Sequence, residues 1–190
     1  VPILLLLAAV WIKQLPVRSY FAWVAARPGI VLLALTAGAA FQLASYAILY
    51  LAGADMTSDA IAQYRSDQTA GDPVWLPLLL AWPSFIAAPL VEESIFRGFL
   101  WRGWETSQLG ARGTWLLSSL VFSAYHIPKV IGTNPLQAGI ILFEDLLLGL
   151  LLGWLRRRSG SILPAMMGHF AYNVIPPVLT FIIGAMLAGH

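Results

Sequence analysis

The stretch Val91-Glu92-Glu93-Ser94-Ile95-Phe96-Arg97 places two carboxylates and a guanidinium inside a segment, residues 74–101, that is otherwise almost entirely apolar. An ionisable side chain at the centre of a bilayer costs about 2.5–3.5 kcal/mol or more. Three such groups within six residues therefore need a partner, a water-filled cavity or a chemical role. Two further apolar segments each carry a histidine, which favours a chemical role.

The composition indicates a membrane protein. Hydrophobic residues make up 59% of the chain and charged residues 11%, where a soluble domain carries about 25% charged residues. The 190 residues predict one integral-membrane domain over residues 1–190, an all-α polytopic transmembrane bundle of six to seven spans. A net charge of +2 argues against nucleic-acid binding, and the absence of cysteine excludes disulfides, thiolate metal sites and a cysteine nucleophile.

Apolar runs and breakers divide the chain. The start at Val1 without Met suggests a processed or truncated product, and residues 1–12 read as the end of a first helix, with a signal-peptide core as the alternative. The segment 74–101 carries three prolines, which predict a kinked or broken helix, and Pro176-Pro177 is expected to end a span. The expected spans are 30–51, 74–101, 114 to at least 126, 136–155, 162–175 and a last apolar segment, 178–188.

Loop charges predict the orientation. The segment 13–27 carries +3, the loop 55–72 carries −3, the turn 102–112 is basic, and Arg156-Arg157-Arg158 adds +3. Basic and non-basic connections alternate. By the positive-inside rule, the arginine-rich ends are expected on the cytoplasmic side.

Four polar residues then fall at similar depths. Counted by helix rise from the basic ends, Glu92 lies roughly 15 Å into its span, His126 roughly 18 Å, His169 roughly 12 Å and Asn173 roughly 18 Å. With a hydrocarbon core of about 30 Å, all four are near the middle. We therefore predict a shared, buried polar site near the bilayer midplane.

The spacing suggests different tasks for the two glutamates. Glu93 and Arg97 are four residues apart, so they are expected to pair on one helix face and to support the site. Glu92 lies on another face. A carboxylate in an apolar bundle is suited to act as a general base that takes a proton from water.

Two chemistries remain open. In one, Glu92 and His126 activate a water for amide hydrolysis, and His169 and Asn173 donate hydrogen bonds to the tetrahedral oxyanion. In the other, Glu92, His126 and His169 bind one divalent metal such as zinc, and water takes the fourth position. The His-Glu-x-x-His pattern of common zinc proteases is absent.

Three motifs taken together resemble a known family. Glu92-Glu93-x-x-x-Arg97, Phe122-x-x-x-His126 and His169-x-x-x-Asn173 are similar to the signatures of the CPBP intramembrane proteases, which include the type II CAAX-prenyl endopeptidases and the abortive-infection and bacteriocin-processing proteins. The Gly-Ser-Ile-Leu-Pro sequence at residues 160–164 also resembles the family. The similarity covers about residues 82–176.

The resemblance implies a helical membrane hydrolase whose site opens toward the cytoplasm, with Glu92 and His126 catalytic, His169 and Asn173 completing the site and Arg97 in support. It implies an intramembrane (metallo)endopeptidase, and the size and lack of further domains fit a bacterial cytoplasmic membrane. Glu144 departs from the signature. Its predicted depth is that of the site, so it is expected to act as an extra ligand, a proton relay or a partner for a positive charge.

Two other functions fit the same sequence. One is a membrane interaction protein, such as a bacteriocin-immunity or assembly factor within a membrane protein complex, that keeps the site without using it. The other is a transporter with midplane carboxylates, which the lack of an internal duplication disfavours. The expected partners of the protease are membrane lipids and a peptide or protein substrate, lipidated or not.

Overall fold

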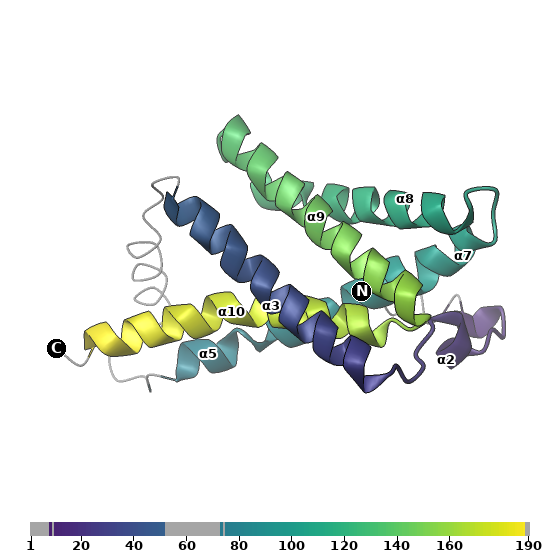
Figure 1. Ribbon diagram of the computed structural model, residues 1–190, viewed down its shortest axis with the longest axis horizontal. Helices are drawn as coiled ribbons and strands as arrows, with labels where there is room; N and C mark the ends of the chain where they lie inside the picture. The colour runs from purple at the N-terminus through teal and green to yellow at the C-terminus, as the bar shows by residue number, and fades with distance from the viewer. Residues whose placement is uncertain (1–7, 9, 52–72, 74, 189–190) are drawn as a thin grey trace.

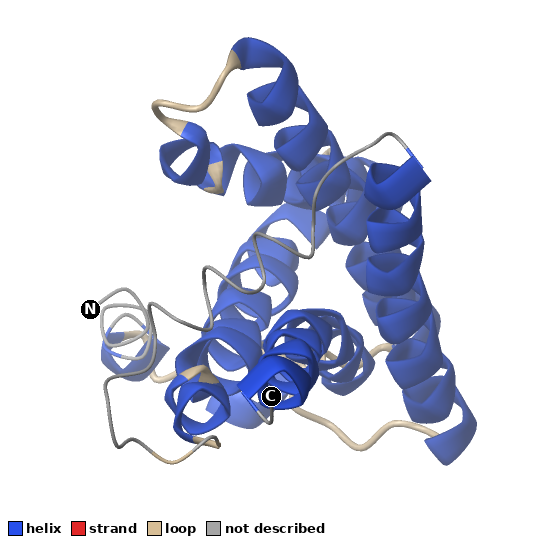
Figure 2. Ribbon diagram, turned by 90° about the vertical axis from the view of Figure 1, so that its left-hand side faces the viewer, coloured by secondary structure: helices blue, strands red, loops and turns tan. Residues whose placement is uncertain are grey.

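The computed structural model describes residues 8, 10–51, 73 and 75–188, and over these residues the chain is helical and contains no strand (Figures 1 and 2). The predicted acidic loop and most of the first apolar segment lie outside the described residues. The elements are α2 (Val17–Tyr20), α3 (Pro28–Leu51), α5 (Leu76–Leu80), η1 (Pro83–Ala87), α6 (Ala88–Glu93), η2 (Ser94–Leu100), α7 (Trp101–Glu105), α8 (Gly110–Tyr125), η3 (Ile127–Val130), α9 (Pro135–Ser159) and α10 (Leu163–Ala188).

The structure is that of a helical membrane protein. Among the described residues, four helical stretches are long and apolar enough to cross a bilayer: Pro28–Leu51, Leu78–Glu105, Pro135–Ser159 and Leu163–Ile182. Helix α8 has 16 residues, which is about 24 Å of rise against a hydrocarbon core of about 30 Å. The expected fourth span thus corresponds to α8, which begins four residues earlier than expected, ends at Tyr125 with His126 as its C-cap, and is shorter than the hydrocarbon core.

The prediction that Pro176-Pro177 ends a span is wrong. Helix α10 continues through both prolines from Leu163 to Ala188. Each proline removes one backbone donor. In an apolar segment, however, a break would expose many more unpaired backbone groups to lipid, and spanning helices therefore tolerate proline.

The glutamate-bearing segment is irregular, but it forms one continuous helical stretch from Leu78 to Glu105 and is not broken into two pieces. The stretch from Leu76 to Glu105 is assembled from the short pieces α5, η1, α6, η2 and α7, and the wide π turns of η1 and η2 flank α6. Pro83 begins η1, and Pro89 lies in the first turn of α6. The two glutamates end α6, and Arg97 lies in the following π turn.

Glycines allow a neighbouring helix to pack closely against each of the two helices that position a histidine. A Cβ on Gly38 of α3 would lie 2.0 Å from the carbonyl oxygen of Gly168 of α10, the residue before His169. A Cβ on Gly149 of α9 would lie 3.1 Å from the Cα of Ser119 of α8. Close backbone approach of this kind is how small residues pack helices in membranes. The buried core beside these contacts contains Ala34, Phe96, Phe122, Leu148, Leu152, Leu155 and Ala165.

Candidate catalytic site

The predicted site residues line one cavity. It has a volume of about 320 Å³ and lies between α6, the end of α8, α9 and α10. Glu92, His126, His169 and Asn173 all contribute to its wall. The other lining residues are Ser84, Ala88, Phe122, Lys129, Asp145, Leu148, Tyr172, Pro176 and Pro177.

The cavity extends away from the arginine-rich ends of the helices. On each element, the lining residues run from the site in that direction: from Glu92 back to Ser84, from His126 on to Lys129, from Leu148 back to Asp145 and from His169 on to Pro177. On the other side of Glu92, the side chains of Glu93, Phe96 and Arg97 are buried. The lining residues therefore lie mainly on the side of Glu92 that is away from the arginine-rich helix ends.

Glu92 faces both histidines. Its Oε2 atom lies 3.9 Å from Nε2 of His126 and 3.9 Å from Nε2 of His169. This oxygen is buried and has no hydrogen-bond partner among the described residues. The Glu92 side chain as a whole is 13% exposed, so the carboxylate borders the cavity without being sealed.

The hydrogen bonds of the two rings fix where their protons lie. Nδ1 of His126 is 2.9 Å from the carbonyl oxygen of Phe122, and Nδ1 of His169 is 3.0 Å from Oε1 of Glu93. A carbonyl or a carboxylate can only accept, so each Nδ1 donates. In the neutral rings, each Nε2 then presents a lone pair toward Glu92.

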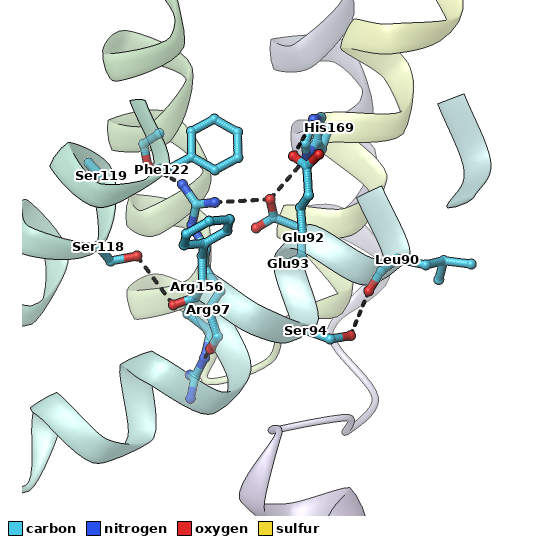
Figure 3. A network of polar contacts seen from close by, with 12 residues as sticks. Leu90, Glu92, Glu93, Ser94, Arg97, Ser118, Ser119, Phe122, Arg156 and His169 are labelled. Atoms are coloured by element: carbon cyan, nitrogen blue, oxygen red, sulfur yellow. Dashed lines mark hydrogen bonds and ion pairs between the residues drawn. The ribbon is translucent and has the colours of Figure 1, made fainter. Parts of the chain in front are cut away.

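Glu93 is the centre of a buried ionic network (Figure 3). Arg97 donates from Nη1 to Oε1 of Glu93 at 3.0 Å, and both side chains are fully buried, which confirms the predicted pair. The same oxygen accepts the His169 hydrogen bond. The contact from Glu93 to His169 was missed by sequence reasoning because it joins helices 76 residues apart in the chain.

Arg97 ties this network to the remaining helices. Its Nη2 donates to the carbonyl oxygen of Gly149 on α9 at 2.9 Å, and its guanidinium carbon lies 4.5 Å from the ring centroid of Phe122 on α8. Its own carbonyl oxygen accepts a hydrogen bond from Nε of Arg156 at 3.0 Å. The network therefore closes the site on the side of the arginine-rich ends.

Asn173 has a second task beside lining the cavity. Its Nδ2 donates to the carbonyl oxygen of Ser84 at 2.8 Å. Ser84 lies in η1, where a π turn pairs each carbonyl with the N–H five residues later; for Ser84 that residue is Pro89, which has no N–H. An amide nitrogen carries two hydrogens, so one remains available toward the cavity.

Two neighbouring acids on α9 hold residues beside the histidines. Glu144 accepts a hydrogen bond from the Tyr172 hydroxyl at 2.7 Å, and Asp145 pairs with Nζ of Lys129 at 3.5 Å. Tyr172 follows His169 by three residues, and Lys129 follows His126 by three. Glu144 was predicted to act as a ligand, a relay or a partner for a cation; its hydrogen-bond partner is a tyrosine. The sequence did not predict that Lys129 lies at the site, because it appears there only as a charged residue in a loop.

The donor atoms suit zinc in type but not in spacing. Oxygen and nitrogen ligands at about 2.0–2.2 Å from one tetrahedral zinc lie about 3.3 Å apart, whereas Glu92 is 3.9 Å from each imidazole nitrogen. Within the part of the chain that the structure describes, no three His, Cys, Asp or Glu side chains are placed to hold a metal ion. The described geometry does not fit a bound metal.

Comparison with known proteins identifies the family. The family model of the type II CAAX prenyl endopeptidase Rce1-like proteins matches residues 73–175. This is more than half of the chain and includes every cavity-lining residue except Pro176 and Pro177. No curated protein and no solved structure is similar enough to count as a match. The chain belongs to the Rce1-like family of type II CAAX prenyl endopeptidases, the CPBP proteins that its three motifs resemble.

Proposed function

We propose that this protein is an intramembrane endopeptidase that hydrolyses a peptide bond with a water activated by Glu92 between His126 and His169. Membership of the family implies a protease. The observation that carries the mechanism is the pair of 3.9 Å separations between Glu92 Oε2 and the two Nε2 atoms. A water about 2.8 Å from Oε2 and from either Nε2 forms ordinary hydrogen bonds to both.

The described donors and acceptors suffice for the two halves of the reaction. Glu92 takes a proton from the water as the water oxygen attacks the carbonyl carbon, and returns that proton to the leaving amine when the carbon–nitrogen bond breaks. The second hydrogen of the water is donated to the Nε2 lone pair of either His126 or His169. In this proposal His169 does not have the oxyanion-binding role that its sequence motif predicted, because its Nδ1 hydrogen is donated to Glu93.

The developing oxyanion has two donors within the cavity wall. The free amide hydrogen of Asn173 and the ammonium of Lys129 both line the cavity that holds Glu92. The Lys129 side chain is 53% exposed and pairs with Asp145, whose side chain is 5% exposed. Loss of a single oxyanion donor costs about 100- to 1,000-fold in kcat in a well-studied protease.

We further propose that the arginine-rich ends are cytoplasmic and that the cavity opens toward the opposite face of the membrane. The strong bias of Arg and Lys to residues 13–27, 102–112 and 156–158 supports the first part. The direction in which the lining residues run supports the second. A substrate would then enter from the non-cytoplasmic side or from that half of the bilayer.

The test is cleavage by purified protein in liposomes. The probe is a fluorescent, farnesylated peptide ending in a CAAX sequence, the substrate class in the family description, together with unprenylated peptides of the same sequence. Glu92→Gln and His126→Ala should each reduce turnover by about 100- to 10,000-fold without loss of folded protein. The control is Glu105→Gln, at a half-buried acid that pairs with Arg102 and does not line the cavity; this variant should cleave normally.

Two results would overturn the mechanism. One is normal turnover by folded Glu92→Gln protein. The other is loss of turnover on chelation with recovery only on adding zinc, which would require Glu92 and the histidines to close on a metal. If wild-type protein cleaved none of the peptides while binding a membrane partner in a fixed ratio, the interaction function would replace the protease.

A further inference from the structure

A second cavity lies at the arginine-rich end of the bundle. Its volume is about 860 Å³, and it is bounded by the connection before α3, the first turns of α3 and the last turns of α9. Helix α3 begins and helix α9 ends on this side (Figure 1). It shares no lining residue with the catalytic cavity. Its volume is in the range of small-molecule binding sites, about 300–1,000 Å³.

The three consecutive arginines at the end of α9 have different surroundings. Arg156 is buried, donates to the backbone of Arg97 and lies 5.6 Å from the ring centroid of Trp101. Arg157 lies over the ring of Trp115, 5.3 Å from its centroid. Arg158 lines the second cavity. The sequence alone indicates one topology signal in these three arginines. In the structure, Arg156 makes a buried backbone contact, Arg157 contacts an aromatic ring, and Arg158 places a positive charge in the cavity wall.

The cavity presents two cations without a neutralising acid. Arg27 and Arg158 both line it and are exposed, and neither forms an ion pair with a described acid. No aspartate or glutamate belongs to the lining. Gly29 adds open space beside them, since a Cβ there would meet nothing within 4 Å. This charge pattern fits an anion.

Polarity changes along the depth of the cavity. Arg27 and Arg158 lie at the span ends, while Leu33 and Trp154 lie five residues inside the ends of their helices, or about 7–8 Å by helix rise. Leu33 is 45% exposed and Trp154 39% exposed, and both line the cavity. A free phosphate would use only the outer half. An amphiphile, with its charge at the mouth and carbon chains below, would use both.

We propose that this cavity binds an anionic phospholipid, with its phosphodiester between Arg27 and Arg158 and the first carbons of its acyl chains against Leu33 and Trp154. Anionic lipids attract basic residues at the cytoplasmic surface, the side on which these arginines are expected. The lipid links the start of α3 to the end of α9. Binding should therefore raise the melting temperature of the protein, independently of any protease activity.

Native mass spectrometry of the purified full chain in detergent tests the proposal. The probes are phosphatidylglycerol and phosphatidylcholine with identical acyl chains. Wild-type protein should retain phosphatidylglycerol preferentially, and Arg27→Gln and Arg158→Gln should each weaken its binding about fivefold. Arg157→Gln, which removes the same charge one residue away, should leave affinity unchanged, and Arg158→Lys should keep most of it.

Each alternative outcome has a distinct meaning. Equal losses in Arg157→Gln and Arg158→Gln would replace the site by a diffuse basic surface and overturn the proposal. So would equal retention of phosphatidylcholine, or displacement of the lipid by soluble glycerol phosphate, which would indicate a free anion. Because Arg27 and Arg158 are exposed, their variants should melt at the wild-type temperature without added lipid. A lower melting temperature in both would show a structural role instead.

Discussion

The two glutamates of α6 are neighbours in sequence but belong to different regions of the molecule. Glu93 lies in a sealed region where its carboxylate accepts hydrogen bonds from Arg97 and His169 and has no exposed surface. Glu92 lies in an open region, 13% exposed, with a buried oxygen 3.9 Å from two imidazoles and bonded to neither. Each carboxylate has one buried oxygen without a partner among the described residues, but only Glu93 also joins two neighbouring side chains through its other oxygen. We propose that Glu93 stabilises the fold and that Glu92 reacts.

The same contrast divides the whole bundle. Toward the arginine-rich ends, Arg97 and Arg156 join η2, α8 and α9 through buried contacts. Toward the opposite end lies the cavity between α6, α8, α9 and α10, where Glu92, His126 and Asn173 are half-buried and His169 is buried. Because buried charges need partners while reacting groups need access, a membrane hydrolase benefits from keeping the two kinds of group on opposite sides of one helix turn.

Cysteine labelling gives an all-or-none test of which region faces which side of the membrane. The natural chain has no cysteine, so single variants report one position. Ile131→Cys, at a 77% exposed residue just beyond η3, should react with an impermeant maleimide added to intact cells. Arg112→Cys, at the basic start of α8, should react only after permeabilisation. The reverse pattern would place the cavity on the cytoplasmic side.

Removing the cation from the sealed region should have the largest effect on stability. Arg97→Met leaves Glu93 buried without its ion-pair partner, and such changes destabilise proteins by about 3–5 kcal/mol. We expect a markedly lower melting temperature in detergent and a poor yield of folded protein. Lys129→Met breaks an ion pair at the cavity, where Lys129 is 53% exposed, and should cost far less. If Arg97→Met and Lys129→Met lowered the melting temperature by similar amounts, the proposed distinction between the sealed and the open region would be wrong.

Adding one methyl group where α3 contacts α10, beside His169, should destabilise the protein. Gly38→Ala places a Cβ against the carbonyl of Gly168, so α10 must shift, at a cost of about 1–3 kcal/mol. Turnover should fall with it, because His169, the residue after Gly168, is displaced relative to Glu92. Gly103→Ala is the matched control, as a Cβ there meets nothing within 4 Å. Unchanged melting and turnover in Gly38→Ala would contradict the close contact of α3 and α10.

A smaller effect is expected where α9 supports the open region. Tyr172→Phe removes the hydroxyl that donates to Glu144 and leaves a partly buried carboxylate unpaired, at a cost of about 1–3 kcal/mol. We expect a modest drop in melting temperature and a lower kcat with KM little changed. Tyr50→Phe, at a 73% exposed residue, is the control. An effect on KM alone would make Tyr172 a substrate contact.

Several of these features could be predicted from sequence because they are local. The four-residue spacing of Glu93 and Arg97 correctly predicts their pairing. The three prolines indicate an irregular helix, which the structure has as π turns within a continuous helical stretch. The motifs also correctly indicate the family. Helix α10 shows the limit of local rules: two prolines would end most helices in water, but in a continuous apolar segment the helix continues.

Contacts between helices could not be read from the sequence. The bond from His169 to Glu93 depends on how α10 lies against α6, which the Gly38–Gly168 contact fixes from a third helix. The pairing of Lys129 with Asp145 likewise depends on the turn that follows His126. The direction of the cavity follows from all of these together, so no single motif predicts it.

A side-by-side measurement of Glu92→Gln and Glu93→Gln tests the central claim most directly. Turnover of one peptide and the melting temperature are measured on the same preparations, with turnover expressed per folded molecule. We predict that Glu92→Gln melts near the wild-type temperature and has lost turnover, while Glu93→Gln melts lower and its remaining folded molecules still cleave. Loss of turnover in both with unchanged melting, or retained turnover in Glu92→Gln, would contradict the account.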